Sequence, residues 1–432
     1  MKGIYSLTLA GAFIATAGVV FFQKLGSEKT ALSSGSSSSG SAYQQNSRSP
    51  AIRSSKSSPF NNKTVLTEES NITEVRRLII KRSKLKRLSD YLLKNPSEIN
   101  SLTAEQAAEL VVAFANDLLL KLPGLTSIDK DVAQELANYE GIWLNLEGLT
   151  SIGEDVAYEL AKYEGRLIDL SGLTSIGEDV AYQLAKYKGR LNLAGVTSID
   201  QDVARELAKH EGKWLKLSGL TSIDEGVAYE LAKWGETGAQ LYLSGLTSID
   251  KGVAYELAKY DGSIILGLSS IDNDVAEGLA KKEGGQLHLW DLVSIDKDVA
   301  QALSRYGGLL SLKGVELIDK DVARELSNSD LTSLNLTGLT SIDSDVLQEM
   351  AQFQGQLSFS NLSSIDREAA EKLANYTGYA GRRMYIKGET NLDPDPQILE
   401  ILNSNPAIQL PSKYRDNESA KQGSVPKPPP AE

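Results

Sequence analysis

Few residues of this chain could carry acid–base, nucleophilic or metal chemistry. Its 432 residues include two histidines, His210 and His288, and no cysteine. The lack of cysteine excludes disulfides, thiolate zinc sites, iron–sulfur clusters and a cysteine nucleophile. Two imidazoles leave little material for histidine-based catalysis, and no nucleophile–base–orienter set is visible. We therefore expect a protein that is not an enzyme and that uses no cofactor.

Paired carboxylates are the other candidate for chemistry, because Asp-x-Asp recurs along the chain. Examples are Asp129-Lys130-Asp131, Asp296-Lys297-Asp298 and Asp319-Lys320-Asp321. A row of such pairs could attract Ca²⁺, which needs six to eight oxygen ligands. Each pair also stands just before Val-Ala-x-x-Leu, where an aspartate would accept orphan N–H groups at a helix start and face the positive end of the helix dipole. We favour helix caps over a metal site.

Aromatic and polar residues form the best candidate for binding. In Leu287-His288-Leu289 the alternation turns the leucines inward and leaves His288 and Trp290 on an exposed sheet face. Corresponding positions of neighbouring copies hold Trp214, Lys216 and Tyr242. Large exposed aromatics beside polar groups are typical of binding hot spots. We predict that Trp214, Lys216, Tyr242, His288 and Trp290 bind a ligand; the alternative is scattered surface aromatics without a role, or aromatics that lie under a neighbouring turn.

Two further aromatic positions recur on the helices. His210 stands where other copies have Tyr163, Tyr187 and Tyr260, so we expect it to pack at a helix end. A second helix position holds tyrosine in four copies: Tyr158, Tyr182, Tyr229 and Tyr255. These could form a ladder for carbohydrate, but packing between neighbouring helices, with the hydroxyl group left in water, is favoured.

All of these residues belong to one unit repeated many times. LEGLTSIGEDVAYELAKYEG from Leu146 and LSGLTSIDKGVAYELAKYDG from Leu243 show it clearly, and a marker isoleucine recurs every 22–26 residues in about twelve units. Val156, Leu160 and Tyr163 form one helix stripe. Glycines two residues after the helix-end aromatic or its substitute are expected to be left-handed helix stops: Gly141, Gly165, Gly189, Gly212, Gly262, Gly284, Gly355 and Gly378. Alternation such as Leu144-Asn145-Leu146 then predicts a short strand.

A single unit cannot fold alone. Its six large apolar side chains would yield about 9–18 kcal/mol if fully buried, while ordering about 24 residues costs roughly 36 kcal/mol. Stacked copies bury both flanks of each apolar layer and let the strands pair in parallel.

The pattern L-x-L-x-G-[LV]-x-S-I-[DG], followed by a short helix, resembles a bacterial leucine-rich repeat over about 98–390. It is most similar to the subclass of bacterial surface proteins without an asparagine ladder, because Leu149, Leu173 and Leu220 stand where the better known pattern has asparagine. The resemblance implies an α/β solenoid with a parallel sheet on one face. It also implies binding of a protein or surface polymer, with no catalytic motif.

The N-terminus predicts a membrane connection. The uncharged run from Gly3 to Phe22 would span roughly 30 Å as a helix. A cleaved signal peptide ending at Ala15-Thr16-Ala17 is the alternative. The predicted order is anchor or signal (1–23), Ser-rich linker (24–71), basic amphipathic helix (72–97), solenoid (98–390), and C-terminal cap with a Pro-rich tail (391–432). The repeats would be extracytoplasmic, or secreted after signal cleavage.

Charge is distributed unevenly. The net charge is −12, yet residues 23–100 carry +8 and residues 101–432 carry −21. An acidic body makes nucleic acid an unlikely partner. The basic helix is predicted to cap the solenoid, with an anionic membrane surface or nucleic acid as alternatives. We expect a protein that binds through its sheet face; the alternative is a structural spacer without a specific ligand.

Overall fold

The computed structural model describes residues 97–235, 238–359, 365, 367–376, 383–386, 396–410 and 414. In these residues thirteen helices alternate with thirteen strands. The helices are α3 (Ala104–Ala113), α4 (Lys130–Ala137), α5 (Glu154–Leu160), α6 (Glu178–Leu184), α7 (Gln201–Leu207), α8 (Glu225–Ala232), α9 (Lys251–Ala258), α10 (Asn273–Leu279), α11 (Lys297–Leu303), α12 (Lys320–Ser327), α13 (Ser344–Met350), α14 (Arg367–Leu373) and α15 (Pro396–Asn403). The strands are β1 (Leu119–Lys121), β2 (Trp143–Asn145), β3 (Leu167–Asp169), β4 (Arg190–Asn192), β5 (Trp214–Lys216), β6 (Gln240–Leu243), β7 (Ser263–Leu266), β8 (Gln286–Leu289), β9 (Leu309–Ser311), β10 (Ser333–Asn335), β11 (Gln356–Phe359), β12 (Met384–Ile386) and β13 (Ile408–Gln409).

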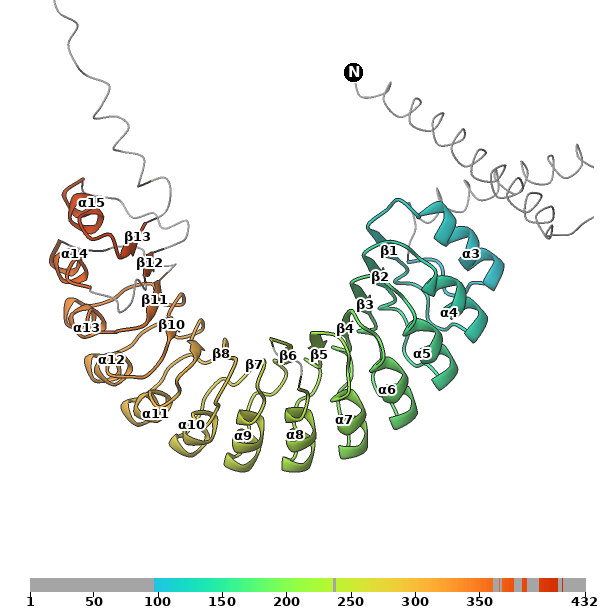
Figure 1. Ribbon diagram of the computed structural model, residues 1–432, viewed down its shortest axis with the longest axis horizontal. Coiled ribbons are helices and arrows are strands. Elements are labelled where there is room, and N and C mark those ends of the chain that lie inside the picture. Colours follow the sequence, from blue (N-terminus) through green and yellow to red (C-terminus); the bar gives the residue numbers. More distant parts are fainter. Residues whose placement is uncertain are drawn as a thin grey trace, which may run out of the picture. The chain divides into compact units, whose positions relative to one another are not determined.

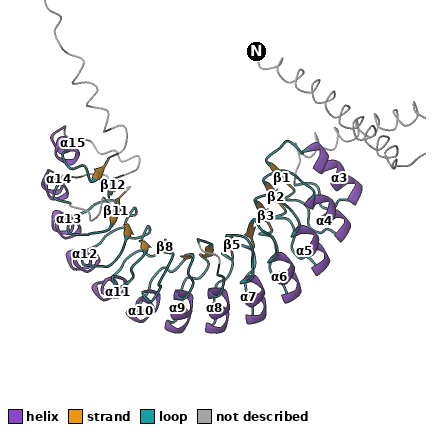
Figure 2. Cartoon of the chain, in the orientation of Figure 1, coloured by secondary structure: helices purple, strands orange, loops and turns teal. Residues whose placement is uncertain are grey.

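The strands form one parallel sheet in chain order, β1 to β13, with each strand paired to its sequence neighbours. Along this repeat array the strands line the inner side of an arc and the helices line its outer side (Figures 1 and 2). The predicted fold class, a leucine-rich-repeat-like α/β solenoid with a parallel sheet on one face, is confirmed. Helix α15 and strand β13 continue the sheet beyond residue 390, within the segment predicted as a C-terminal cap.

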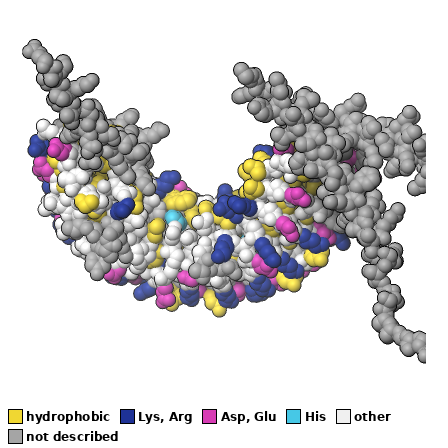
Figure 3. Space-filling model, turned by 45° about the horizontal axis from the view of Figure 1, so that its top comes forward, with side chains coloured by type: hydrophobic (Ala, Val, Ile, Leu, Met, Phe, Trp, Pro, Cys, Tyr) yellow, Lys and Arg dark blue, Asp and Glu magenta, His cyan; other side chains and the backbone are white. Residues whose placement is uncertain are grey.

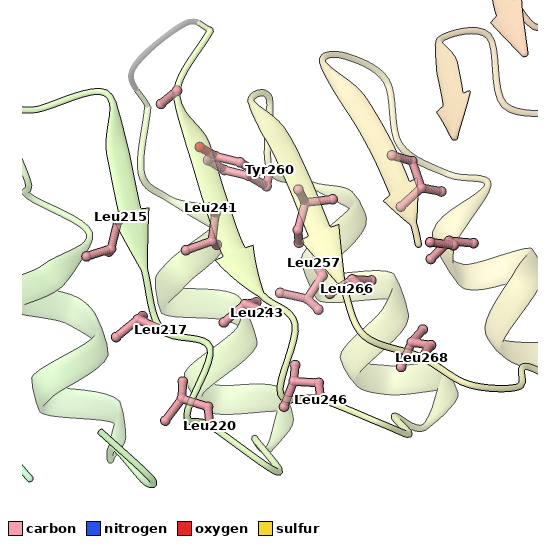
Figure 4. Packing of buried hydrophobic residues seen from close by; sticks show 14 of the residues in the cluster. Leu215, Leu217, Leu220, Leu241, Leu243, Leu246, Leu257, Tyr260, Leu266 and Leu268 are labelled. Carbon is pink, nitrogen blue, oxygen red and sulfur yellow. The ribbon is translucent and has the colours of Figure 1, made fainter. Parts of the chain in front are cut away.

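Leucine columns hold the array together. Leu215, Leu217 and Leu220 of one unit are fully buried, and Leu241, Leu243 and Leu246 repeat the arrangement in the next unit (Figure 4). Each such side chain contributes about 1.5–3 kcal/mol when buried. Because neighbouring units cover both sides of each leucine layer, the burial depends on the stack rather than on the single unit.

Aspartates cap the helices as predicted. The side chains of Asp129, Asp200, Asp272, Asp296 and Asp319 each accept a hydrogen bond from the backbone N–H three residues later, at 2.8–2.9 Å. Asp224 and Asp250 do the same. Asp343, Gly153 and Gly177 occupy the cap position without a side-chain hydrogen bond to the helix. Asp366 lies outside the described residues.

The predicted left-handed glycine stops are wrong. Among the described residues, only Gly238 and Gly285 have positive φ, and neither was predicted. Close packing explains the recurring glycines instead, since a Cβ on Gly165 would lie 2.1 Å from the Tyr163 ring atoms. Gly378 lies outside the described residues.

A column of helix-end residues accounts for this packing. We call it the helix-end column: Tyr139, Tyr163, Tyr187, His210, Trp234, Tyr260, Lys282, Tyr306, Phe353 and Tyr376, all buried. Tyr163 stacks on Tyr139 and on Tyr187, with 6.2 Å between ring centroids in both pairs. The Tyr187 hydroxyl donates to the carbonyl of Gly165 in the preceding unit at 2.8 Å, and Tyr163 bonds Gly141 likewise.

His210 belongs to this column, which confirms that it is a packing residue. Its side chain is 1% exposed, and its ring lies 5.7 Å from that of Trp234. The Trp234 indole N–H donates to the His210 carbonyl at 2.8 Å. The column therefore continues through the unit in which histidine replaces the usual tyrosine.

The N-terminal predictions lie outside the described residues. This holds for the apolar run Gly3 to Phe22, the Ser-rich linker and the basic amphipathic helix, apart from its last residue. No helix in the described ranges is long and apolar enough to cross a membrane.

Candidate functional site

Register brings most of the predicted binding residues into one row on the inner sheet face. Lys216 of β5 pairs with Tyr242 of β6, Tyr242 with Ile265 of β7, and Ile265 with His288 of β8. Their side chains share a face because residues two apart on a strand point the same way. Trp214 stands two residues before Lys216, and Trp290 two residues after His288.

The aromatic rings of this face meet in two pairs. Trp214 and Tyr242 lie 5.0 Å apart between ring centroids with planes tilted by 48°, and His288 and Trp290 lie 5.3 Å apart at 62°. Ile265, which is 2% exposed, fills the position between the pairs. We call Trp214, Lys216, Tyr242, His288 and Trp290 the aromatic stripe. Figure 3 shows yellow hydrophobic side chains beside a cyan histidine on the inner side of the arc.

In each aromatic pair, one ring contacts a glutamine side chain. The Tyr242 hydroxyl donates to Gln240 Oε1 at 3.3 Å, and His288 Nε2 lies 3.1 Å from Gln286 Oε1. Both glutamines come from the same strand as the ring that they contact. One ring of each aromatic pair therefore has a polar contact within its own strand.

The stripe is accessible and mostly uncharged. Trp290 is 37% exposed, while Trp214, Lys216, Tyr242 and His288 are half-buried. Burial lowers the pKa of His288 to about 4, so its imidazole is neutral at pH 7. Such a surface can stack on apolar or aromatic groups and bond amides. The Lys216 ammonium, and Lys313, which lies 5.8 Å from the Trp290 ring centroid, add positive charge at its margins.

Beyond the stripe, the inner face is more closed than the alternation predicts. Strand alternation places Asn145 and Ser311 on the face opposite the buried leucines, yet they are 2% and 1% exposed. Asn145 bonds Glu147 at 3.1 Å, and Asp169 accepts from Asn192 of the next strand at 2.9 Å. Side chains on adjacent strands stand only about 4.8 Å apart, so small polar residues there cover one another.

A second surface was missed by the sequence reasoning. A groove of about 1220 Å³ runs across the start of strands β2 to β6. We call it the basic groove, and its key residues are Trp143, Arg166, Lys188, Arg190, Lys213 and Trp214. A sequence pattern could have predicted this groove. A basic residue follows the helix-end glycine in three successive units, in Gly165-Arg166, Gly189-Arg190 and Gly212-Lys213.

The outer helix tyrosines are only half-buried. Tyr158, Tyr182, Tyr229 and Tyr255 are 44–49% exposed. A lysine four residues later lies over each ring, as for Lys162 at 4.0 Å from the Tyr158 centroid and Lys186 at 3.9 Å from that of Tyr182. Cation–π contacts thus cover rings that were expected to pack between helices.

The carboxylates form no metal cluster in the part of the chain that the structure describes, where no group of three or more histidine, aspartate or glutamate side chains could hold an ion. The aspartates that suggested calcium act as helix caps.

No protein-family model matches the chain, and no curated protein matches it. Solved structures with similarity include the yeast Rad7–Elc1 complex, at 13% identity and a TM-score of 0.36, covering 82% of this chain and 99% of that one. The Toll–Spatzle complex of Drosophila matches at 14% identity and a TM-score of 0.39, over 68% of this chain and 42% of that one. The TLR13–ssRNA13 complex matches at 15% and 0.32, over 67% and 39%. These low values say nothing about the partner of this chain.

Proposed function

We propose that this chain is a non-catalytic, membrane-associated or exported repeat protein that binds a protein or surface polymer through the aromatic stripe. The observation that carries the proposal is the pair of tilted aromatic contacts, Trp214–Tyr242 and His288–Trp290, on the inner sheet face. Large aromatic side chains in such positions dominate binding energies.

Contacts within the stripe support this proposal. Tyr242 and His288 each have a polar contact to a glutamine of their own strand, which lowers the side-chain entropy that these two residues would lose on binding. The ring edges, indole N–H groups and neutral imidazole favour a partner with apolar groups and amides or hydroxyls. Proteins and surface polysaccharides both present this chemistry.

The test replaces Trp214 and Trp290 together by alanine in the full chain. Two hot-spot aromatics should cost roughly 2–4 kcal/mol of binding energy, measured as lost capture of the crosslinked partner, while the melting temperature changes little. The matched control is Tyr158→Ala with Tyr255→Ala, which removes two half-exposed aromatics from the outer helices.

Three results would count against the stripe. A sharp fall in melting temperature would make the tryptophans packing residues. Unchanged capture with unchanged melting would place the contact surface elsewhere. Absence of any captured partner for the unaltered chain would favour a structural spacer.

The membrane association is proposed from the uncharged run Gly3 to Phe22. Full-length protein should sediment with membranes and resist carbonate extraction, whereas a chain beginning at Leu25 should not. A native N-terminus at Gly18, measured by mass spectrometry, would replace the anchor by a cleaved signal.

A further inference from the structure

We infer that the basic groove binds a short acidic segment of a partner protein, at a site that shares Trp214 with the aromatic stripe and otherwise consists of different residues. The stripe is mostly uncharged and lies on the sheet face. The groove is cationic and lies where the strands begin.

Strand pairing assembles the groove from successive units. Trp143 pairs with Leu167, and Leu167 with Arg190, at the first positions of β2, β3 and β4. Trp214 and Gln240 are paired in the same way on β5 and β6. Arg166, Lys188 and Lys213 come from the turns that lead into these strands, so charges about 24 residues apart in sequence meet along one edge.

The charges of the groove differ from those on the outer helices. Arg166, Lys188 and Arg190 are exposed and form no salt bridge within the described ranges. On the helices, by contrast, Lys209 forms a salt bridge with Glu206 at 2.6 Å, and Lys233 forms one with Glu230 at 2.9 Å. Among the described lining residues Glu164 is the one acid. Arg166, Lys188 and Arg190 therefore give the groove positive charge that no salt bridge among the described residues offsets, whereas residues 101–432 together carry a net charge of −21.

The dimensions and the surrounding charge favour a short acidic peptide. Trp143 and Trp214 stand three strands apart, or about 14 Å, which an extended peptide covers in four to five residues. Carboxylates spaced along such a peptide can bond the guanidinium groups of Arg166 and Arg190, while apolar residues between them contact the tryptophans. Residues 101–432 carry a net charge of −21, so a long polyanion that extends beyond the groove meets repulsion from the rest of this segment.

The test measures fluorescence anisotropy of a labelled ten-residue peptide of alternating glutamate and alanine, added to the full chain. Its counterpart with glutamine for glutamate is the peptide control. The variant Arg166→Gln/Lys188→Gln/Arg190→Gln should weaken binding of the acidic peptide about tenfold or more, because charge-assisted contacts are lost. The matched control Lys281→Gln/Lys297→Gln/Arg305→Gln changes net charge equally on exposed helix-side positions and should alter binding by less than about twofold.

Several outcomes would overturn the inference. They are equal loss in both triple variants, equal binding of the glutamine peptide, or no binding at all. Tighter binding of a twenty-nucleotide single strand or of phosphatidylserine vesicles at the same salt would assign the groove to another class of partner. Trp290→Ala alters the stripe but no residue of the groove. It should leave peptide binding intact while it weakens capture of the crosslinked partner, so failure of the stripe and failure of the groove are distinguishable. Melting temperatures of all variants check that the fold survives.

Discussion

At the scale of single residues, the helix-end column shows how one aromatic joins two units. The ring of Tyr306 packs against its own turn, and its hydroxyl donates to the carbonyl of Gly285 in the preceding unit at 2.8 Å. Burial raises the pKa of this hydroxyl to about 12, so it stays protonated and able to donate. The glycine two residues after the aromatic, Gly308, is required by the Tyr306 side chain, which leaves no space for a Cβ.

Gly308→Ala should therefore destabilise the protein. A Cβ there would lie 2.1 Å from the Tyr306 hydroxyl oxygen, and overpacking of this kind costs roughly 1–3 kcal/mol. The matched control is Gly307→Ala in the same turn, where no atom lies within 4 Å and φ is not positive. Urea unfolding monitored by circular dichroism measures both. Equal midpoints for the two variants would show that Tyr306 does not require a glycine at position 308.

His210 should make stability depend on pH. Neither ring nitrogen has a hydrogen-bond partner among the described residues, and burial lowers its pKa to about 4, although the nearby carbonyls of Ala185 and Gly189 act in the opposite direction. The unfolded chain binds the proton near pH 6.5, so the free energy of unfolding falls as pH drops from about 6.5 to 4 and the contribution then levels off.

His210→Tyr should remove this contribution, because a tyrosine hydroxyl could donate to Gly189 as the other tyrosines donate to their glycines. Relative to the unaltered chain, we expect a gain on the order of 1–3 kcal/mol at pH 4.5 that shrinks toward pH 7.5. Urea unfolding at a series of pH values measures it. The lowered pKa of His288 is present in both proteins, so its effect on stability cancels in the comparison. A gain that is constant with pH would reflect packing alone.

At the scale of elements, the short helices depend on their first residue. Most described helices have only seven or eight residues. The first four backbone N–H groups, which have no partner within the helix, are therefore a large fraction of all the N–H groups in each helix. In α7 the Asp200 carboxylate accepts from the N–H of Val203 at 2.9 Å, and it also faces the positive end of the helix dipole. In α13, Asp343 occupies the same position without that bond.

Asp200→Ala should thus cost about 0.5–2 kcal/mol of unfolding free energy. Asp343→Ala is the internal comparison and should cost less, since only the dipole interaction is lost. Thermal unfolding of the two single variants in the same buffer gives the difference. If the two losses are equal, the hydrogen bond contributes little and the dipole explains the preference for aspartate.

At the scale of the whole molecule, stability is shared between neighbours. Contacts in this array run from each unit to the next, through paired strands, leucine layers and the helix-end column. Such an array behaves approximately as a row of units with nearest-neighbour coupling. A substitution that destabilises a central unit should therefore also destabilise the neighbouring units, and the effect should become smaller with distance along the array.

Leu217→Asp tests this coupling. Leu217 is fully buried between the leucine layers of adjacent units, and an unpaired carboxylate there would cost several kcal/mol. Hydrogen exchange should show the largest loss of protection at β5, smaller losses at β4 and β6, and near-normal protection at β1 and β11. Lys216→Asp, one residue away on the accessible face, is the control. Uniform loss across all strands would mean that the array unfolds as one unit.

The sequence by itself determined the repeat, the order of elements and the inward side chains. Leucine alternation and the aspartate before each helix are local signals that recur with a period of about 24 residues. The inward positions of Leu287 and Leu289 and the packing role of His210 could therefore be predicted. The rows of the aromatic stripe followed from the same period, because equal positions in successive units must align on the sheet.

Only the tertiary structure decided how neighbouring units approach one another. Gly165 was expected to terminate a helix through its backbone conformation, but the ring of Tyr163 is what requires it. Alternation turns Asn145 away from the buried leucines, but it is 2% exposed in the structure. The basic groove depends on three turns meeting at one edge, and the contact between Trp214 and Tyr242 depends on rotamers of two units. Distances between units are set by packing across the stack, which no single repeat encodes.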